Sequence, residues 1–423
     1  MTGLLTVREA QERILGTLQP AEVETIGTEG CAGRILAQQI TAPADLPPFD
    51  NSSMDGFAVL AEDVQRAAQG APVVLEIVAD IPAGAVADRP IHSGQAARIM
   101  TGAPLPEGAD AVVPVEDTNF APGSGKSELW GVDGHGANVQ ILKPVRPGSS
   151  VRRRGDDVRA GAVLLEPGRK LQPQDAGMIA SVGLAEVQVY RKPRVALFSS
   201  GDELVQPGQP LGPGQIYDSN QTVLAAILEQ HGAEVIRLGS APDDPRQIEA
   251  MLDRAVEKQV DLIITSAGVS VGAFDYVRQV IEAHGSLNFW RVNMRPGKPL
   301  AYGAYSGIPL IGLPGNPVSA FVGCRVFVLP ALYRLAGRSI TEPVRLKATL
   351  AEDVESDGRE SYLRAVITLE NGDSGGRLIA TLTGHQGSGN LYSLVQANAL
   401  LIVPSGVKSL PSGTEVEVWF LEN

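Results

Sequence analysis

Apolar residues recur at helical intervals near the start of the chain. Val7, Ala10 and Ile14 lie three or four residues apart, and the Thr-x-x-Glu sequence that opens this stretch has the spacing of a capping box. We expect a helix over Thr6–Leu18. A proline pair at positions 47 and 48 breaks the pattern, and the following stretch, Phe49–Ala58, is predicted to be a loop and a first candidate for function.

Short β-branched runs replace the helical pattern between residues 73 and 145. Val73–Val78 and Val139–Leu142 are two of these runs, and Gly and Pro turns separate them. We predict a small β-rich domain here. Because helical and irregular segments bracket it on both sides, it is expected to be an insertion within a discontinuous linker domain.

Strands and helices alternate beyond residue 191, which indicates a parallel sheet with helices on both faces. The expected strands are Arg194–Phe198, Glu234–Leu238, Asp261–Thr265 and Pro309–Gly312. The expected helices are Ser219–His231, Pro245–Gln259 and Phe274–His284, the first opened by its serine and closed by Gly232. After residue 337 the chain returns to strands, among them Val344–Leu350, Tyr362–Leu369 and Val416–Phe420.

These patterns predict a multidomain α/β protein. Its parts are a doubly wound, mostly parallel sheet domain, a β-rich inserted domain, a discontinuous linker domain and a C-terminal all-β domain. The expected bounds are 1–43 with 147–183 for the linker, 44–146 for the insertion, 184–337 for the α/β domain and 338–423 for the C-terminal domain.

The charge of the chain limits the kinds of partner it can bind. The 423 residues include 35 Lys and Arg against 48 Asp and Glu, a net charge of -13, which argues against a nucleic-acid or anionic-membrane partner.

Three further features bear on the compartment. The longest apolar stretch, Val318–Leu332, contains Arg325 and Pro330 and is shorter than the ~20 residues that span a bilayer. The N-terminus lacks the apolar run of a signal peptide. Two cysteines, Cys31 and Cys324, suit a reducing compartment, and we expect a cytoplasmic protein.

Three polar motifs follow strands of the predicted parallel sheet, where such sheets bind ligands. They are Phe198–Glu203, Thr265–Gly272 and Gly312–Ser319. Glycine in such turns lets backbone amides approach a phosphate closely, and serine hydroxyls add donors. Each motif alone is more often a plain tight turn. Neither G-x-G-x-x-G nor a P-loop sequence occurs at these junctions, which counts against a dinucleotide oxidoreductase and a P-loop NTPase.

Carboxylates gather at the same predicted edge. Asp202 and Glu203 follow the first strand, Asp243 and Asp244 follow the second, and Asp275 lies beyond the third. Two or three such groups beside a phosphate site would hold Mg²⁺, which bridges carboxylate and phosphate oxygens. For any single one of them helix capping is the alternative, above all for the pair that precedes a proline. For the set, metal binding is favoured.

Positive charge comes from a short turn that prolines rigidify. Arg291, Arg295 and Lys298 lie within it, and a guanidinium can bind a tetrahedral oxyanion bidentately. A solvated basic turn is the alternative. The run Arg152–Asp157 is ambiguous, because a charge run is usually a surface face.

Several of these strings, in this order, resemble the MoeA family of bacterial molybdopterin molybdenumtransferases, which is related to the C-terminal domain of gephyrin. The resemblance covers essentially the whole chain. The motifs that carry it are Asp50–Ala58, Ile99–Pro104, Arg153–Asp157, Ser200–Leu204, Gly268–Gly272, Leu313–Pro317 and Gly384–Ser388.

The resemblance implies a four-domain, elongated homodimer with an α/β domain of the molybdopterin-binding type. Its cleft would lie between the α/β domain of one subunit and the β-rich domain of the other, so that Asp55 and Thr101 reach across the interface. Glu203, Asp244 and Asp275 would handle Mg²⁺ and the pyrophosphate of adenylated molybdopterin, and they are the expected metal ligands. Other cofactor-biosynthesis proteins are possible partners.

A larger set of residues is expected to bind the pterin and molybdate. Its members are Ser200, Gly201, Gly268, Ser270, Gly272, Arg291, Arg295, Lys298, Pro314, Gly315, Asn316, Pro317, Arg364 and Ser388. Arg291 and Arg295 stand where many family members have lysine, so we expect anion binding through altered contacts. His385 is expected mainly to orient the turn that contains Ser388.

The implied activity is a transferase reaction that inserts molybdenum from molybdate into adenylated molybdopterin and releases AMP. Two other functions remain open from the sequence: adenylylation of the pterin by the same kind of α/β domain, and a non-catalytic scaffold that binds pterin or peptide. The sequence leaves open whether molybdate or tungstate is preferred.

Overall fold

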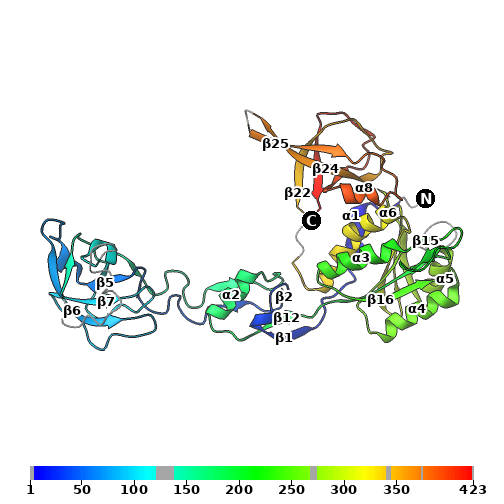
Figure 1. The fold of residues 1–423 in the computed structure, drawn as a ribbon. Helices are drawn as coiled ribbons and strands as arrows, with labels where there is room; N and C mark the ends of the chain where they lie inside the picture. Colours follow the sequence, from blue (N-terminus) through cyan, green and yellow to red (C-terminus); the bar gives the residue numbers. More distant parts are fainter. Residues whose placement is uncertain (1–3, 121–137, 267–273, 340–343, 373–374, 422–423) are drawn as a thin grey trace. The chain divides into compact units, whose positions relative to one another are not determined.

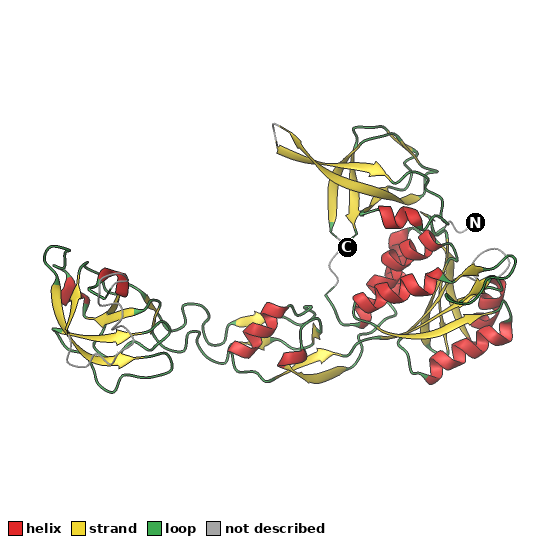
Figure 2. Cartoon of the chain, viewed as in Figure 1, coloured by secondary structure: helices red, strands yellow, loops and turns green. Residues whose placement is uncertain are grey.

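The computed structural model describes residues 4–120, 138–266, 274–339, 344–372 and 375–421 (Figures 1 and 2). The chain divides into two compact units. One unit contains Met1–Gln38, Pro167–Ala176 and Ala185–Asn423, and the other contains Gln39–Glu166 and Gly177–Leu184. We call them the large unit and the small unit.

A five-stranded sheet forms most of the small unit. Its strands are β5 (Gly56–Val59), β6 (Val73–Ile81), β7 (Gln95–Ile99), β8 (Ala111–Pro114) and β9 (Asn138–Ile141), in the order β8-β5-β7-β6-β9. Alternate residues of β6 are buried, as the period of two predicts. The chain enters and leaves this sheet through two antiparallel strand pairs, β3 (Ile40–Thr41) with β11 (Val163–Leu165) and β4 (Asn51–Ser52) with β10 (Val151–Arg152).

A six-stranded mixed sheet forms the centre of the large unit, in the order β16-β13-β17-β21-β20-β18. The strands are β13 (Arg194–Ser200), β16 (Glu234–Ala241), β17 (Leu262–Ser266), β18 (Gly285–Arg291), β20 (Pro299–Tyr305) and β21 (Ile308–Leu313). The four strands expected from the sequence are the parallel ones. The antiparallel pair β18 and β20 was not expected, because these strands need no crossover helix and contain few β-branched residues.

Helices cover both faces of this sheet, and the alternation along β13 shows how. Val195 and Leu197 lie in a core with helices α3 (Ser219–Gln230), α6 (Pro317–Gly323) and α7 (Leu329–Leu335). Their neighbours Ala196 and Phe198 lie in a second core with α4 (Pro245–Glu257) and α5 (Phe274–His284). The doubly wound fold class is therefore confirmed.

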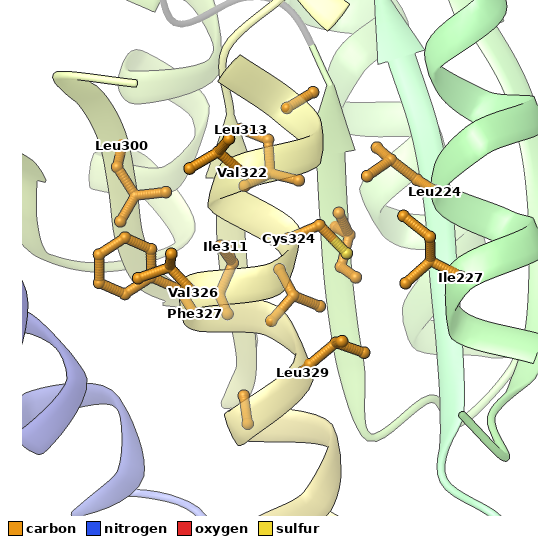
Figure 3. Packing of buried hydrophobic residues seen from close by; sticks show 14 of the residues in the cluster. Leu224, Ile227, Leu300, Ile311, Leu313, Val322, Cys324, Val326, Phe327 and Leu329 are labelled. Carbon is orange, nitrogen blue, oxygen red and sulfur yellow. The ribbon is translucent and has the colours of Figure 1, made fainter. Parts of the chain in front are cut away.

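Figure 3 shows the first of these cores, in which Leu224 and Ile227 of α3 approach Cys324 across from Ile311 and Leu313. The continuous helical stretch Pro317–Leu335 is apolar enough to cross a membrane, but 72% of its apolar window is buried. It is the central helix of this core. Both cysteines, Cys31 and Cys324, are buried and free.

Capping determines where the helices begin and end. Helix α1 (Val7–Leu15) has the predicted capping box, in which the side chains of Thr6 and Glu9 each accept from the other residue's amide, but it ends before Leu18 because Gly16 forms its C-cap. Helix α3 is capped by Asp218 and not by Ser219, since the Asp218 side chain accepts from the amide of Gln221.

A closed β-barrel forms the C-terminal part of the large unit. Its strands β22 (Arg345–Leu350), β24 (Glu360–Gly372), β25 (Gly375–Leu382), β26 (Ala399–Val403) and β28 (Glu415–Phe420) close because β26 pairs with both β24 and β28. A short strand from the α/β part, β19 (Met294–Arg295), pairs in parallel with the start of β24. This pairing links the barrel to the mixed sheet.

The remaining elements are short. They are β1 (Val23–Gly27), β2 (Ile35–Leu36), α2 (Pro173–Ser181), β12 (Glu186–Tyr190), β14 (Leu204–Val205), β15 (Ile216–Tyr217), a π-helical segment between α6 and α7 (Cys324–Val328), β23 (Val354–Glu355), α8 (Tyr392–Gln396), β27 (Ser409–Leu410) and the 3-10 helices Thr28–Gly30, Ala61–Val64 and Val115–Asp117.

Candidate active site

Two neighbouring parallel strands of the mixed sheet end in buried hydroxyl groups. Ser199 and Ser200 close β13, and Thr265 and Ser266 close the neighbouring β17, with Ser199 paired to Ser266 in register. The hydroxyl oxygens of Ser199, Ser200 and Thr265 have no hydrogen-bond partner in the described part of the chain. Because a buried hydroxyl without a partner is unfavourable, this edge is prepared for a polar ligand.

The turn after β13 brings a carboxylate over the same edge. Gly201 has a φ of +151°, and a Cβ atom there would lie 2.4 Å from Oε2 of Glu203. The Glu203 side chain therefore folds back over a position that only glycine can occupy without displacing it. Asp202 and Glu203 are both exposed.

Asp243 faces this pair, although the sequence favoured its neighbour Asp244. The Asp243 amide donates to Oδ1 of Asp202 (3.2 Å), and its own Oδ1 is buried with no partner among the described residues. Burial raises the pKa of Asp243, and the charges of Asp202 and Glu203 raise it further. Three carboxylates thus share one small region.

Asp244 has a different role in the structure. It is the N-cap of α4, and its Oδ1 accepts from the amides of Arg246 (2.9 Å) and Gln247 (3.1 Å). The helix-capping alternative that the sequence left open therefore describes the contacts of Asp244, while Asp243 keeps an unpartnered oxygen.

Part of the second motif lies outside the described residues. Gly268, Ser270 and Gly272 belong to this part. Asp275 is the second residue of α5, but its side chain is also outside the description. Among the described residues, no group of three or more His, Cys, Asp or Glu side chains is arranged to hold a metal ion.

The start of α3 supplies polar residues that the sequence did not single out. Asn220 donates through Nδ2 to Oγ of Ser266 (2.8 Å) and to the carbonyl of Gly315 (2.7 Å). Buried Asp218 accepts from Gln221 and from Oγ of Ser240 (3.0 Å). These side chains tie the ends of β16 and β17 to the third motif. A signal was present, since an Asp-Ser-Asn sequence opens the helix, but its long-range contacts could not be predicted.

The third motif, Gly312–Ser319, joins this edge to the barrel. Pro314 is buried, while Gly315 and Asn316 are exposed, and Asn316 is the N-cap residue of α6, with Pro317 as its first helical residue. The amide of Val318 in the first turn donates to the carbonyl of Ser388 (3.1 Å).

A buried arginine lies at the barrel side of this contact. Arg364 of β24 is fully buried; its Nε donates to Oγ of Ser393 (2.9 Å) and its Nη2 to the carbonyl of Gly387 (3.0 Å). Its Nη1 is buried and has no partner among the described residues. Burial lowers the pKa of Arg364 to about 10, with a further contribution from the nearby charge of Arg295, so the guanidinium remains charged at neutral pH.

The Gly384–Ser388 turn is fixed to Arg364 by its own side chains. Gln386 accepts from the Arg364 amide (2.9 Å) and donates to the Arg364 carbonyl (3.1 Å). The His385 ring lies against Gly387, where a Cβ atom would come within 2.5 Å of the ring. These contacts agree with an orienting role for His385.

The side chains of the basic turn, Arg291, Arg295 and Lys298, lie in different environments. Arg295 lies near Arg364 and near Asp357, and Lys298 is exposed. Arg291 stacks on Trp290, with its guanidinium carbon 3.6 Å from the ring centroid. Arg295 and Arg364 therefore form a cationic cluster beside the turn that contains Ser388, whereas Arg291 is held on the surface of edge strand β18.

The remaining two candidate residues, Asp55 and Thr101, lie in the small unit. Oδ1 of Asp55 accepts from both the amide and the hydroxyl of Thr101, each at 2.7 Å. The two residues are thus brought together at one end of the five-stranded sheet.

A large cavity lies elsewhere in the large unit. It has a volume of about 1250 Å³ between α1, α7 and the barrel, with Leu15, Tyr333, Tyr362 and Trp419 among its lining residues. None of the candidate residues above lines it. The polar edge and the cationic cluster contain the unpartnered hydroxyl, carboxylate and guanidinium groups found among the described candidate residues.

Comparison with known proteins covers nearly the whole chain. Residues 5–183 match the MoeA N-terminal region (domains I and II), residues 196–334 match a probable molybdopterin binding domain, and residues 347–421 match the MoeA C-terminal region (domain IV).

Full-length relatives agree with these matches. Molybdopterin molybdenumtransferase 2 of Mycobacterium tuberculosis is 39% identical over 98% of this chain and 99% of its own length. The molybdopterin molybdenumtransferase of Haemophilus influenzae is 35% identical over 98% of both chains. The crystal structure of a molybdopterin biosynthesis MoeA protein from Pyrococcus horikoshii superposes with a TM-score of 0.79 at 30% identity, over 99% of this chain and 100% of that one.

Proposed function

The chain belongs to the MoeA family and is a molybdopterin molybdenumtransferase of molybdenum cofactor biosynthesis, and from this premise we propose how its residues divide the work. The polar edge of the mixed sheet binds the diphosphate of adenylated molybdopterin. The cationic cluster of Arg295 and Arg364, with Ser388 beside it, binds molybdate. AMP is released as the metal enters the pterin.

The observation that carries this proposal is the buried guanidinium of Arg364. A cation with one donor, Nη1, left without a partner among the described residues is costly unless an anion completes its hydrogen bonds. A second cation, Arg295, lies beside it, and a dianionic tetrahedral oxyanion matches both the charge and the donor geometry. Molybdate is such an ion.

The polar edge suits the diphosphate for a related reason. The unpartnered hydroxyls of Ser199, Ser200 and Thr265 are donors that phosphate oxygens accept. Gly201 keeps the backbone open there, and Asn316, Pro317 and Gly315 present the N-terminal turn of α6. The proposed binding residues also include Pro314 and Lys298. To these we add Gly268, Ser270 and Gly272, which lie outside the described residues.

Mg²⁺ fits the acidic residues of this edge. Glu203 and Asp243 offer hard oxygen ligands. One oxygen of Asp243 has no hydrogen-bond partner among the described residues, so it is available as a metal ligand. Mg²⁺ needs only one or two carboxylates when phosphates and water supply the rest, so a complete protein cage is not required. Asp275 is the proposed third ligand, and the capping contacts of Asp244 leave it a supporting role. When bound, Mg²⁺ would neutralise charge on the diphosphate.

In the proposed reaction the protein's side chains hold the reactants for two steps, hydrolysis of the phosphoanhydride and exchange of an oxo ligand of molybdate for the dithiolene sulfurs. Water adds across the phosphoanhydride, which gives AMP and the pterin phosphate. The two dithiolene sulfurs replace one oxo ligand of molybdate, and that oxygen leaves as water with the two thiol protons. Arg364 and Arg295 fix the oxyanion, while the hydroxyls at the ends of β13 and β17 fix the diphosphate, so catalysis depends on orientation.

A homodimer would complete the site. Glu203, Gly315 and Lys298 are exposed in the single chain, and the resemblance brings Asp55 and Thr101 to them from a second subunit. The paired carboxylate and hydroxyl of those two residues would present one polar surface to the substrate. The proposed compartment is the cytoplasm.

The test is AMP release from adenylated molybdopterin by the purified protein with molybdate and Mg²⁺. We expect release that depends on both ions and that falls at least about tenfold in Glu203→Gln, which loses a charged ligand. A fully active Glu203→Gln enzyme would remove that residue from its role. Release of pyrophosphate from ATP and unadenylated pterin would instead identify an adenylyltransferase.

A further inference from the structure

The short strand that contains Arg295 pairs with the barrel, while Met294 beside it is buried in the core of the α/β part. Strand β19 contains only Met294 and Arg295, and it pairs in parallel with Glu360 and Ser361 at the start of β24. Arg364 lies on the same strand β24. The distance between the two arginines therefore depends on how β19 is fastened to β24.

One side chain, Arg359, adds to this strand pairing. Its Nη1 donates to the carbonyl of Met294 (3.1 Å), the residue directly before Arg295. Its Nε donates to Oδ2 of Asp357 (3.0 Å), Nη2 contacts the same oxygen, and its amide donates to Oδ1 (3.1 Å). Ser361, which is fully buried, adds a hydrogen bond from its Oγ to the Arg359 carbonyl (2.9 Å).

Asp357 also interacts electrostatically with Arg295. Hydrogen bonds from Arg359 lower the pKa of Asp357, and the charge of Arg295 lowers it further, so the carboxylate is ionised and close to Arg295. Two guanidinium groups that approach one another repel, and a carboxylate beside one of them reduces that repulsion. Asp357 thus allows Arg295 and Arg364 to stay together before an anion binds.

We infer that Arg359, together with Asp357, is a positioning residue for the proposed oxyanion site. It fixes the backbone that carries Arg295 against strand β24, which contains Arg364, and so determines the affinity for molybdate more than the rate of the chemical steps. This inference rests on the proposed function. Arg359 itself directs its described donors to Met294 and Asp357, which is why it acts through Arg295.

The geometry requires arginine in particular. A lysine at position 359 keeps the positive charge, but its single ammonium cannot serve the Met294 carbonyl and the Asp357 carboxylate in the same fixed fork. Arg359→Lys therefore separates position from charge. A residue that mattered only through its charge would tolerate this change.

The experiment titrates molybdate in the AMP-release assay and measures molybdate binding directly by calorimetry without pterin. For Arg359→Lys we expect KM for molybdate and the dissociation constant to rise about tenfold, as for loss of a charge-assisted hydrogen bond, with kcat changed less than about twofold. Arg377→Lys is the matched control, because Arg377 pairs with Glu370 on an exposed part of the same barrel and should change neither value.

A double variant tests whether the effect passes through Arg295. In an Arg295→Gln background, Arg359→Lys should have almost no further effect on molybdate affinity, whereas independent residues would give additive losses. Unchanged affinity in Arg359→Lys or Arg359→Gln, additive losses, or weak binding accompanied by unfolding at the assay temperature would each overturn the inference. If the wild type binds no molybdate, or Arg364→Gln binds it normally, the proposed function fails instead.

Discussion

Asp243 and Asp244 are neighbours in the sequence with opposite surroundings. Asp244 accepts two amide hydrogen bonds at the start of α4, and Asp243 has a buried oxygen without a partner among the described residues. Both residues lie just before Pro245, and aspartate is common at a helix N-cap, so the sequence allowed either of them to cap the helix. Only the direction of each side chain distinguishes a capping carboxylate from one that is available to a ligand.

This difference predicts separate effects for the two residues. Asp243→Asn should lower Mg²⁺-dependent AMP release at least about tenfold. Its stability at pH 7 should be equal or higher, because the folded state raises the pKa of Asp243, and ionising such a carboxyl therefore costs stability as pH rises. Asp244→Ala should instead lose about 1 kcal/mol of stability with AMP release retained below its melting temperature.

Thermal melting and AMP release at several Mg²⁺ concentrations, measured on both variants, check this prediction. Asp244→Asn is the control, because asparagine keeps the cap and should leave stability and activity unchanged. Loss of activity in Asp244→Asn with an active Asp243→Asn enzyme would reverse the assignment of the two residues.

Single residues show where sequence reasoning succeeds. The glycine and serine motifs could be assigned to the strand ends, because the apolar runs of β13 and β17 showed where these strands end. The burial of Arg364 could not be predicted, since an arginine in a strand usually faces solvent. The contact from Asn220 to Gly315 spans 95 residues and has no local pattern.

At the scale of elements, the ambiguous charge run Arg152–Asp157 has a structural explanation. Arg153 pairs with Asp50 (2.6 Å) and Arg154 with Asp45 (2.6 Å), across the two chain crossings beside the five-stranded sheet of the small unit. Asp45 also accepts from the amide of Ala160 (2.9 Å) and Asp50 from that of Arg154 (2.8 Å). The run is therefore a fastening between crossings and not a free basic face.

These contacts predict a pH dependence in the small unit. Hydrogen bonds from the Ala160 and Arg154 amides, followed by those from the arginine side chains, hold the pKa values of Asp45 and Asp50 below their usual range. Because a depressed folded-state pKa stabilises above the unfolded value, the contribution is complete at neutral pH. It is lost as pH falls below about 4 and through the folded-state values.

Hydrogen exchange at the Arg154 and Ala160 amides measures this effect, after correction for intrinsic rates. A combined Asp45→Asn and Asp50→Asn variant should lose protection at pH 7, and the wild type should approach the variant at about pH 3. Asp88→Asn is the control, since Asp88 pairs on the surface with its neighbour Arg89. Protection that is independent of pH in the wild type would contradict the prediction.

At the scale of the whole molecule, the sequence predicted the classes of domain better than their connections. The parallel strands, both helix layers and the closing β domain followed from hydrophobic periodicity. The pairing of β19 with β24, the antiparallel edge β18–β20 and the closure of the barrel through β26 are contacts between distant segments. No local period encodes such contacts, so they appear only when the chain is folded.

The division of candidate residues between two units leads to the last prediction. Asp55 and Thr101 belong to the small unit, and Glu203 and Arg364 belong to the large unit. If one active site takes Asp55 from one subunit and Glu203 from the other, two inactive variants, each with one of these residues changed, can form a mixed dimer that has an intact site. A dimer of one Asp55→Asn chain and one Glu203→Gln chain then has one site with both changes and one site with neither.

Mixing the two inactive variants under conditions of subunit exchange should therefore restore AMP release to about a quarter of the wild-type value, since half of the dimers are mixed and each has one intact site. In the Asp55→Asn chain the new side chain can still accept from Thr101 through its amide oxygen, so the local fold of the small unit is kept. Differently tagged chains allow the mixed dimer to be purified, and its specific activity should be about half that of the wild type. A mixed dimer as inactive as its parents would show instead that each site draws both residues from one chain.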